Sequence, residues 1–220
     1  MKWISSLDEL LYEVMSWLIF FPLTLWRTLV HPFRMMEYAE QQLTLPAEEQ
    51  YGTALSPPLF LALTLMLAHG VAAALGEQDA IVASKHGLAG LINDNTSALV
   101  LRMVAFASFP VFAATRLVRR RGVALNRLSL RRPFYAQCYP VAVAALAVSI
   151  GTSLASASLL SVRPVAAPLI RASILYFVVV ETLWFAQKLS IGLVRAAADT
   201  AVVLVEGIAS LFLLGFLFRA

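Results

Sequence analysis

The chain has 220 residues, of which 60% are hydrophobic and 14% are charged, and its formal net charge is +4. A soluble domain carries about 25% charged residues, so this composition excludes an ordinary soluble protein and indicates a membrane protein. Cys138 is the one cysteine, which excludes an intramolecular disulfide and a cysteine-based metal site.

The N-terminal region, residues 1–56, is predicted to form a membrane-surface helix that prolines break. Its longest uncharged run, VMSWLIFFPLTLW at residues 14–26, is shorter than the roughly 20 residues of a membrane span. Pro22 and Pro32 are expected to interrupt the helix, and its tryptophans are typical of the headgroup level. A sixth, kinked span is the competing interpretation. The acidic Asp8 ahead of the apolar run argues against a signal peptide.

Five later segments are apolar enough to cross the membrane as helices. Because a helix satisfies its backbone hydrogen bonds within one segment, residues 57–220 are predicted to form an all-α, polytopic transmembrane bundle. The expected spans are residues 57–75, 98–118, 139–160, 168–188 and 199–218.

The most basic stretch, RLVRRRGVALNRLSLRRPFY at residues 116–135, joins the second and third predicted spans. It would suggest nucleic acid in a soluble protein, but the flanking spans hold it at the bilayer, so lipid and no nucleic acid is the expected partner. Its seven arginines are expected to contact anionic headgroups: Arg116, Arg119, Arg120, Arg121, Arg127, Arg131 and Arg132.

The distribution of basic residues predicts the orientation. Twelve of the seventeen Lys and Arg residues fall on the side of the N-terminus and the arginine stretch. Basic residues are concentrated on the cytoplasmic side of membrane proteins. We therefore expect a bacterial inner-membrane protein with its N-terminus in the cytoplasm and its C-terminus outside.

The proline-rich approach to the first span, in FFPLTLWRTLVHPF and LSPPLFLALTL, and the join RRPFYAQCYPVAVAAL resemble the Yip1-domain membrane proteins. The resemblance covers most of the chain in its layout of five spans, and no functional residue is carried over from it. It implies a non-enzymatic membrane-organising protein or accessory subunit.

Ionisable residues within spans are expensive unless they are paired or wetted, so they are candidate functional residues. Glu181 and Glu206 each lie seven residues from the predicted inner end of a span, about 10 Å deep. At one depth they would form a proton or cation path in an oligomeric permease or ion channel, the alternative function. Otherwise Glu181 reaches Lys188 or the backbone near Thr182, and Glu206 pairs with Arg195 or Asn126. In a third alternative, both carboxyl groups are protonated and packed.

Three further residues extend this candidate path. Asp199 lies on nearly the same helical face as Glu206, and His69 and Arg102 would line the outer end. Alternatively, Arg102 reaches the outer headgroups and His69 bonds to a neighbouring helix.

Small residues in the third span predict close helix packing. Ala147, Gly151 and Ala155 have small-xxx-small spacing, which serves packing within the bundle or the seam of a homo-oligomer or membrane-protein complex. The acidic segment at residues 37–52 is expected to fold back on the arginine stretch or to dock a partner.

The sequence contains no phosphate-binding glycine loop, metalloprotease helix pair or G-x-S-x-G motif. His31, His69 and His86 fall in different segments, so they are not expected to share a metal. The sequence therefore predicts no enzyme and no cofactor.

The orientation is testable with reporter fusions. We expect a fusion near residue 85 to report an external position and one near residue 125 a cytoplasmic position, because the arginine stretch stays inside. The opposite pattern would overturn the orientation.

Overall fold

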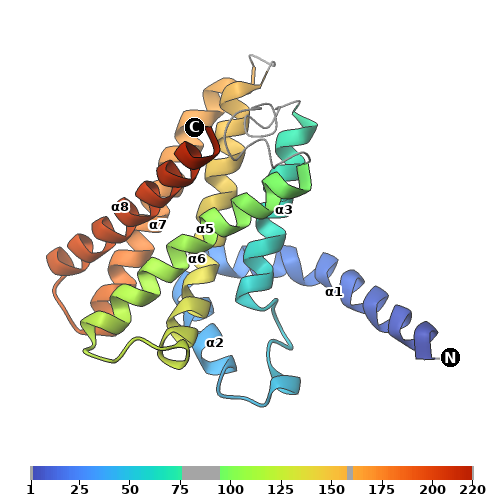
Figure 1. Cartoon of the computed structure of the whole chain (residues 1–220), viewed down its shortest axis with the longest axis horizontal. Coiled ribbons are helices and arrows are strands. Elements are labelled where there is room, and N and C mark those ends of the chain that lie inside the picture. Colours follow the sequence, from blue (N-terminus) through green and yellow to red (C-terminus); the bar gives the residue numbers. More distant parts are fainter. Residues whose placement is uncertain (1, 76–94, 158–160, 220) are drawn as a thin grey trace.

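The computed structural model describes residues 2–75, 95–157 and 161–219. This part of the chain consists of α-helices and one 3-10 turn, which confirms the predicted all-α bundle (Figure 1). Its elements are α1 (Lys2–Val30), α2 (Pro32–Gln42), η1 (Ala47–Glu49), α3 (Pro57–Ala74), α5 (Asn95–Arg120), α6 (Arg127–Ser156), α7 (Arg163–Leu189) and α8 (Leu193–Arg219).

Four of the five predicted spans coincide with helices that are long and apolar enough to cross a membrane. Within the described residues, such segments are Leu11–Val30 of α1, the whole of α3, α6 and α7, and Leu193–Phe216 of α8. The second predicted span is helical as part of α5, although most side chains before Met103 are outside the described set. The apolar helices fit a multi-pass membrane protein.

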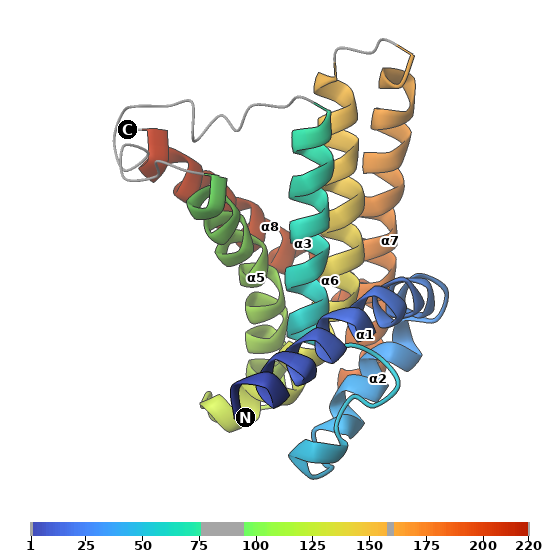
Figure 2. The same ribbon diagram turned by 90° about the vertical axis from the view of Figure 1, so that its right-hand side faces the viewer.

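Helix α6 is the centre of the bundle, because it contacts α3, α5 and α7 as well as α1 and α2. Helices α3, α6 and α7 run side by side, whereas α5 and α8 lean away from them toward the end that holds the C-terminus (Figure 2). The thirty residues of α6 extend about 45 Å, which exceeds a hydrocarbon core of roughly 30 Å. We call the end with the α5–α6 and α7–α8 connections the base.

Helix α1 crosses the base transversely to α3, α6 and α7 (Figures 1 and 2). Its segment Leu11–Val30 is itself long and apolar enough to cross a membrane, so the surface helix and the sixth span both stay predictions. The prediction that Pro22 breaks the helix is wrong, because α1 continues through it to Val30. One proline removes a single intrahelical hydrogen bond, and the apolar residues on both sides still pack on the bundle. The break falls at His31, before Pro32.

The predicted boundaries at the base also need correction. The arginine stretch is not one loop: α5 runs to Arg120, and α6 already begins at Arg127. Asn126 starts α6, since its side chain accepts hydrogen bonds from the backbone of Leu128 and Ser129. The density of arginines suggested a surface loop, but arginine is a good helix former, so a charged stretch can still be helical.

Hydrogen bonds from buried side chains fasten α1 and the segment before α3 to the bundle. The Leu55 N–H donates to Thr24 Oγ1 at 3.1 Å, and the Tyr139 hydroxyl donates to the Leu55 carbonyl at 2.7 Å. The Tyr176 hydroxyl donates to the carbonyl of Thr28 at 2.9 Å. These bonds connect α1 to α6 and α7, so the transverse position of α1 is tied to the bundle.

Replacing Tyr139 with phenylalanine tests this connection. Tyr139→Phe leaves the buried carbonyl of Leu55 without its donor, so we expect the free energy of unfolding in micelles to fall by about 1–3 kcal/mol. Tyr12→Phe is the matched control, because the Tyr12 side chain is exposed and should change stability little. Equal effects of the two substitutions would contradict the anchoring role.

Candidate functional site

Two arginines of α5 hold one buried carboxylate of α8 at the base. Oδ1 of Asp199 accepts from Nε of Arg116 at 2.7 Å and from Nη2 of Arg120 at 2.8 Å. The Asp199 side chain is 0% exposed, whereas those of Arg116 and Arg120 are 26% and 51% exposed. This ion cluster fastens α8 to α5.

The spacing of the sequence explains the ion cluster. Arg116 and Arg120 are four residues apart and therefore share one face of α5. Asp199 is in the second turn of α8, because this helix begins at Leu193, six residues earlier than the predicted span. The carboxylate of Asp199, which the sequence places at the end of a loop, therefore lies within the contact between α5 and α8.

Glu206 on α8 is half-buried and lies near the arginines of α5. It lines a polar pocket of about 350 Å³ together with Arg116, Arg119 and Arg120. Neither Arg195 nor Asn126 forms an ion pair or hydrogen bond with it; Asn126 caps α6 instead. Glu206 therefore neighbours arginines of α5, a grouping that the sequence did not predict.

Glu181 and Glu206 do not lie at the same level, contrary to expectation. The hydroxyl groups of Thr182 and Thr200 are 3.3 Å apart, which aligns Glu181 with the residues around Thr200. Glu206 is six residues from Thr200, about 9 Å along the axis of α8. The error follows from the early start of α8, since the depth had been counted from Asp199.

Glu181 is completely buried, and its two carboxyl oxygens have no hydrogen-bond partner among the described residues. The amide group of Gln137 on α6 is near enough to interact with the carboxyl, yet it is also buried without a hydrogen bond of standard geometry. The predicted contact with Lys188 is absent, because Lys188 binds elsewhere. The pair of Glu181 and Gln137 is a polar site between α6 and α7.

Lys188 connects α7 to α2. Its ammonium lies 2.6 Å from a carboxylate oxygen of Glu40 and 4.4 Å from the centre of the Trp184 ring. Gln187 Nε2 also donates to Glu37 at 3.3 Å. The acidic segment therefore folds back on α7 through these two glutamates. It also folds back on the arginine stretch, as expected, because the ring of Tyr51 stacks on that of Tyr135 with 6.3 Å between the ring centres.

The remaining arginines of the stretch lie at the surface of the base. Arg131, whose guanidinium is 5.7 Å from the centre of the Tyr135 ring, lines a pocket of about 420 Å³ with Arg121, Arg132 and Leu43. Arg119 and Arg127 are exposed as well. Their contact with anionic lipid stays a prediction, as it does for Arg116 and Arg120, which also bind Asp199.

The expected outer residues are not brought into one site. The buried Nδ1 of His69 on α3 has no hydrogen-bond partner in the described part of the chain. Arg102 is in α5, but its side chain is outside the described residues, as is all of His86. No three His, Cys, Asp or Glu side chains of the described residues come together as metal ligands.

The small residues of α6 differ in their surroundings. Gly151 is buried against α7, where an added Cβ would come within 2.5 Å of Ile170. Ala147 is half-buried and Ala155 is exposed. Gly151 thus serves packing within the bundle.

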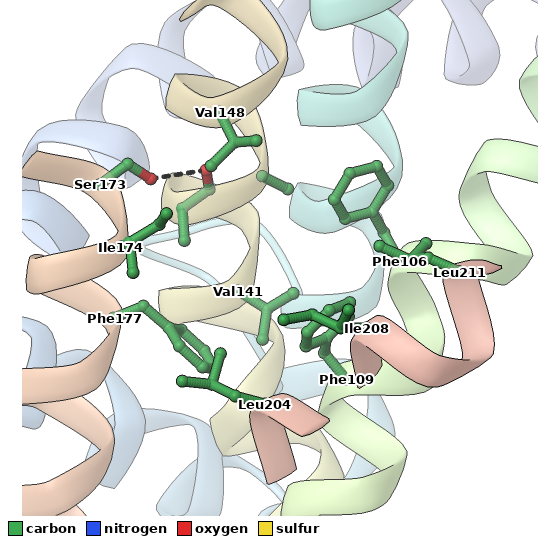
Figure 3. Close-up of a pocket in the computed structure, with 12 residues that line it drawn as sticks. Phe106, Phe109, Val141, Val148, Ser173, Ile174, Phe177, Leu204, Ile208 and Leu211 are labelled. Atoms are coloured by element: carbon green, nitrogen blue, oxygen red, sulfur yellow. Dashed lines mark hydrogen bonds between the residues drawn. The ribbon is translucent and has the colours of Figure 1, made fainter. Parts of the chain in front are cut away.

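An apolar cavity of about 250 Å³ lies between α5, α6, α7 and α8 (Figure 3). Its aromatic wall is formed by Phe106, Phe109 and Phe177. Apart from the small residues of α6, no sequence pattern predicts this cavity, because it depends on how four helices diverge.

The ion cluster generates a stability prediction. Asp199→Asn removes the carboxylate shared by two partly exposed arginines, so we expect a loss of about 1–3 kcal/mol in the free energy of unfolding. Arg119→Gln, which changes a neighbouring arginine that does not bind Asp199, should stay within about 0.5 kcal/mol of the wild type. Chemical unfolding in micelles measures both, and an equal loss would contradict the role of the cluster.

Comparison with known proteins gives no relative of this chain. No protein-family model matches it, and neither a curated protein nor a solved structure does.

Proposed function

We propose that this protein is a non-enzymatic, membrane-organising protein of Yip1-like type, located in a bacterial inner membrane with its base in the cytoplasm. The position of α1 is the observation that carries this proposal. A helix that lies in the plane of one leaflet displaces headgroups and acyl chains in that leaflet alone. The protein therefore acts on the bilayer itself.

The free face of α1 has the chemistry that such a role needs. Leu18 is 67% and Ile19 is 70% exposed, and Leu11, Met15 and Trp26 are exposed as well. The opposite face packs Phe20 and Phe21 on the bundle. Because burying each large apolar side chain gains about 1.5–3 kcal/mol, the free face is stabilised by the apolar part of the leaflet.

The charges at the base support the same role. Arg119, Arg121, Arg127 and Arg132 are exposed around the start of α6, where each cation gains about 1 kcal/mol near an anionic leaflet. The ion pair between Lys188 and Glu40 holds α2 against α7. The apolar face of α1 and these arginines together give the protein a broad contact with one leaflet.

A permease or ion channel is the second candidate, favoured by Glu181. An ionised carboxylate without a partner is very expensive in a low-dielectric interior, so this group either carries a proton or meets a cation during transport. Gln137 provides a second polar group at that point. In this alternative Glu181 is the site, without Glu206 as its partner.

Vesicle remodelling tests the first candidate. We expect the wild type, reconstituted in vesicles with anionic lipid, to reduce vesicle diameter in electron micrographs. The pair Leu18→Lys and Ile19→Lys should abolish this change, because it removes the apolar face of α1. Glu13→Lys adds the same charge at an exposed position that is already polar, and should behave as the wild type.

Ion flux in the same vesicles separates the two candidates. Flux that depends on pH or voltage and is lost in Glu181→Gln would sink the organising role and support the permease. If the wild type left the vesicle diameter unchanged, that result would also contradict the proposed function.

A further inference from the structure

The apolar cavity between α5, α6, α7 and α8 begins near the level of α1. Ile174 on α7 and Ile208 on α8 line it, and Ile174 is two residues from Tyr176, whose hydroxyl donates to the carbonyl of Thr28 in α1. On α6 the lining reaches Val148, nine residues or about 13 Å beyond Tyr139, which bonds to Leu55 beside α1. With α3, α6 and α7 across the membrane, the cavity therefore lies within a hydrocarbon core of roughly 30 Å, on the side of α1.

The same two isoleucines mark where the cavity opens. Ile174 and Ile208 line the cavity, yet they are 48% and 46% exposed. They lie on the two helices that diverge, because α8 leans away from α7 with distance from the base (Figure 2). The cavity consequently opens sideways between α7 and α8, toward the acyl chains of the bilayer.

The lining provides no partner for water or for a polar ligand. Ser173 is its one residue with a polar side chain, and its hydroxyl donates to the carbonyl of Ala144 at 2.9 Å (Figure 3). A buried water needs two to four polar partners. Glu206 lies between Leu204 and Ile208 in sequence, but it belongs to the polar pocket on the other side of the α5–α8 contact. The cavity therefore suits hydrocarbon and not water.

Gly207 keeps the aromatic wall in place. A Cβ at this position would collide with the ring of Phe109, so the ring lies directly against the backbone of α8. Phe109 then meets Phe177 edge-on, with 6.4 Å between the ring centres. The wall that separates the cavity from the α5–α8 contact thus depends on a glycine.

We propose that this cavity is a binding site for one hydrocarbon chain of a bilayer lipid, which enters between Ile174 and Ile208. The site recognises the chain and not the headgroup, because every available contact in it is apolar. This inference goes beyond the proposed function: it requires only that α7 and α8 cross the membrane, and it does not involve α1.

Photolabelling in vesicles tests the site. The probe is phosphatidylcholine with a photoactivatable diazirine in the middle of one acyl chain, and the labelled residues are mapped by mass spectrometry. We expect strong labelling of the cavity lining in α6 and α7. Ala145→Phe and Val148→Phe, two independent substitutions that place a ring in the cavity, should each reduce this labelling several-fold.

Leu175→Phe is the matched control, because residue 175 follows Ile174 but is exposed and does not line the cavity. It should label as the wild type does. Gel filtration identifies the variants that fold. Thermal unfolding of the protein with and without lipid gives a second measurement. The loss of lipid should lower the unfolding midpoint less in a variant whose cavity is filled by a ring. The site would be overturned if the lining residues were labelled no more strongly than the exposed Leu175. It would also be overturned if labelling persisted in folded Ala145→Phe and Val148→Phe variants.

The outcomes separate this site from the proposed function. The α1 variant with Leu18→Lys and Ile19→Lys should keep its acyl-chain labelling while it loses vesicle remodelling. Loss of labelling in the filling variants, with remodelling intact, would show that the site exists independently of the organising role.

Discussion

The ion cluster of Arg116, Arg120 and Asp199 fixes how α8 lies on α5, and the arrangement of the upper bundle depends on it. A fully buried carboxylate cannot leave its two arginines without a large desolvation cost. Helix α8 is therefore held to α5 at the base and follows its tilt away from α6 and α7 (Figure 2). The apolar cavity lies where the two groups of helices diverge.

A second group of contacts defines the base. Thr24 and Thr28 are one turn apart on α1, and both are buried. The Thr24 hydroxyl accepts from the Leu55 N–H, and the backbone carbonyl of Thr28 accepts from the Tyr176 hydroxyl, so α1 is held across the bundle. Helix α1 thus has two apolar faces, one that packs on the bundle and one that is exposed.

The sequence predicted the helical class and most spans, because long apolar segments in lipid have few alternatives to the helix. It did not predict the partners of single charged residues. Asp199 had been counted as the start of a span, although α8 begins at Leu193, and that shift moved Glu206 away from the level of Glu181. Helix ends and tertiary pairing depend on packing, which hydropathy does not record.

The positions of Glu181 and the apolar cavity along the helices bear on the choice between the two candidate functions. Glu181 is near the level of Thr200, whereas the space above it between α7 and α8 is lined by Ile174, Leu204 and Ile208. A hydrated ion that left Glu181 by that route would meet only apolar side chains, where it has no ligands to replace its water. An acyl chain that enters the cavity from the bilayer needs no polar ligands and meets no such barrier. The physical chemistry of this part of the bundle therefore favours a protein that receives lipid over one that conducts ions between α7 and α8.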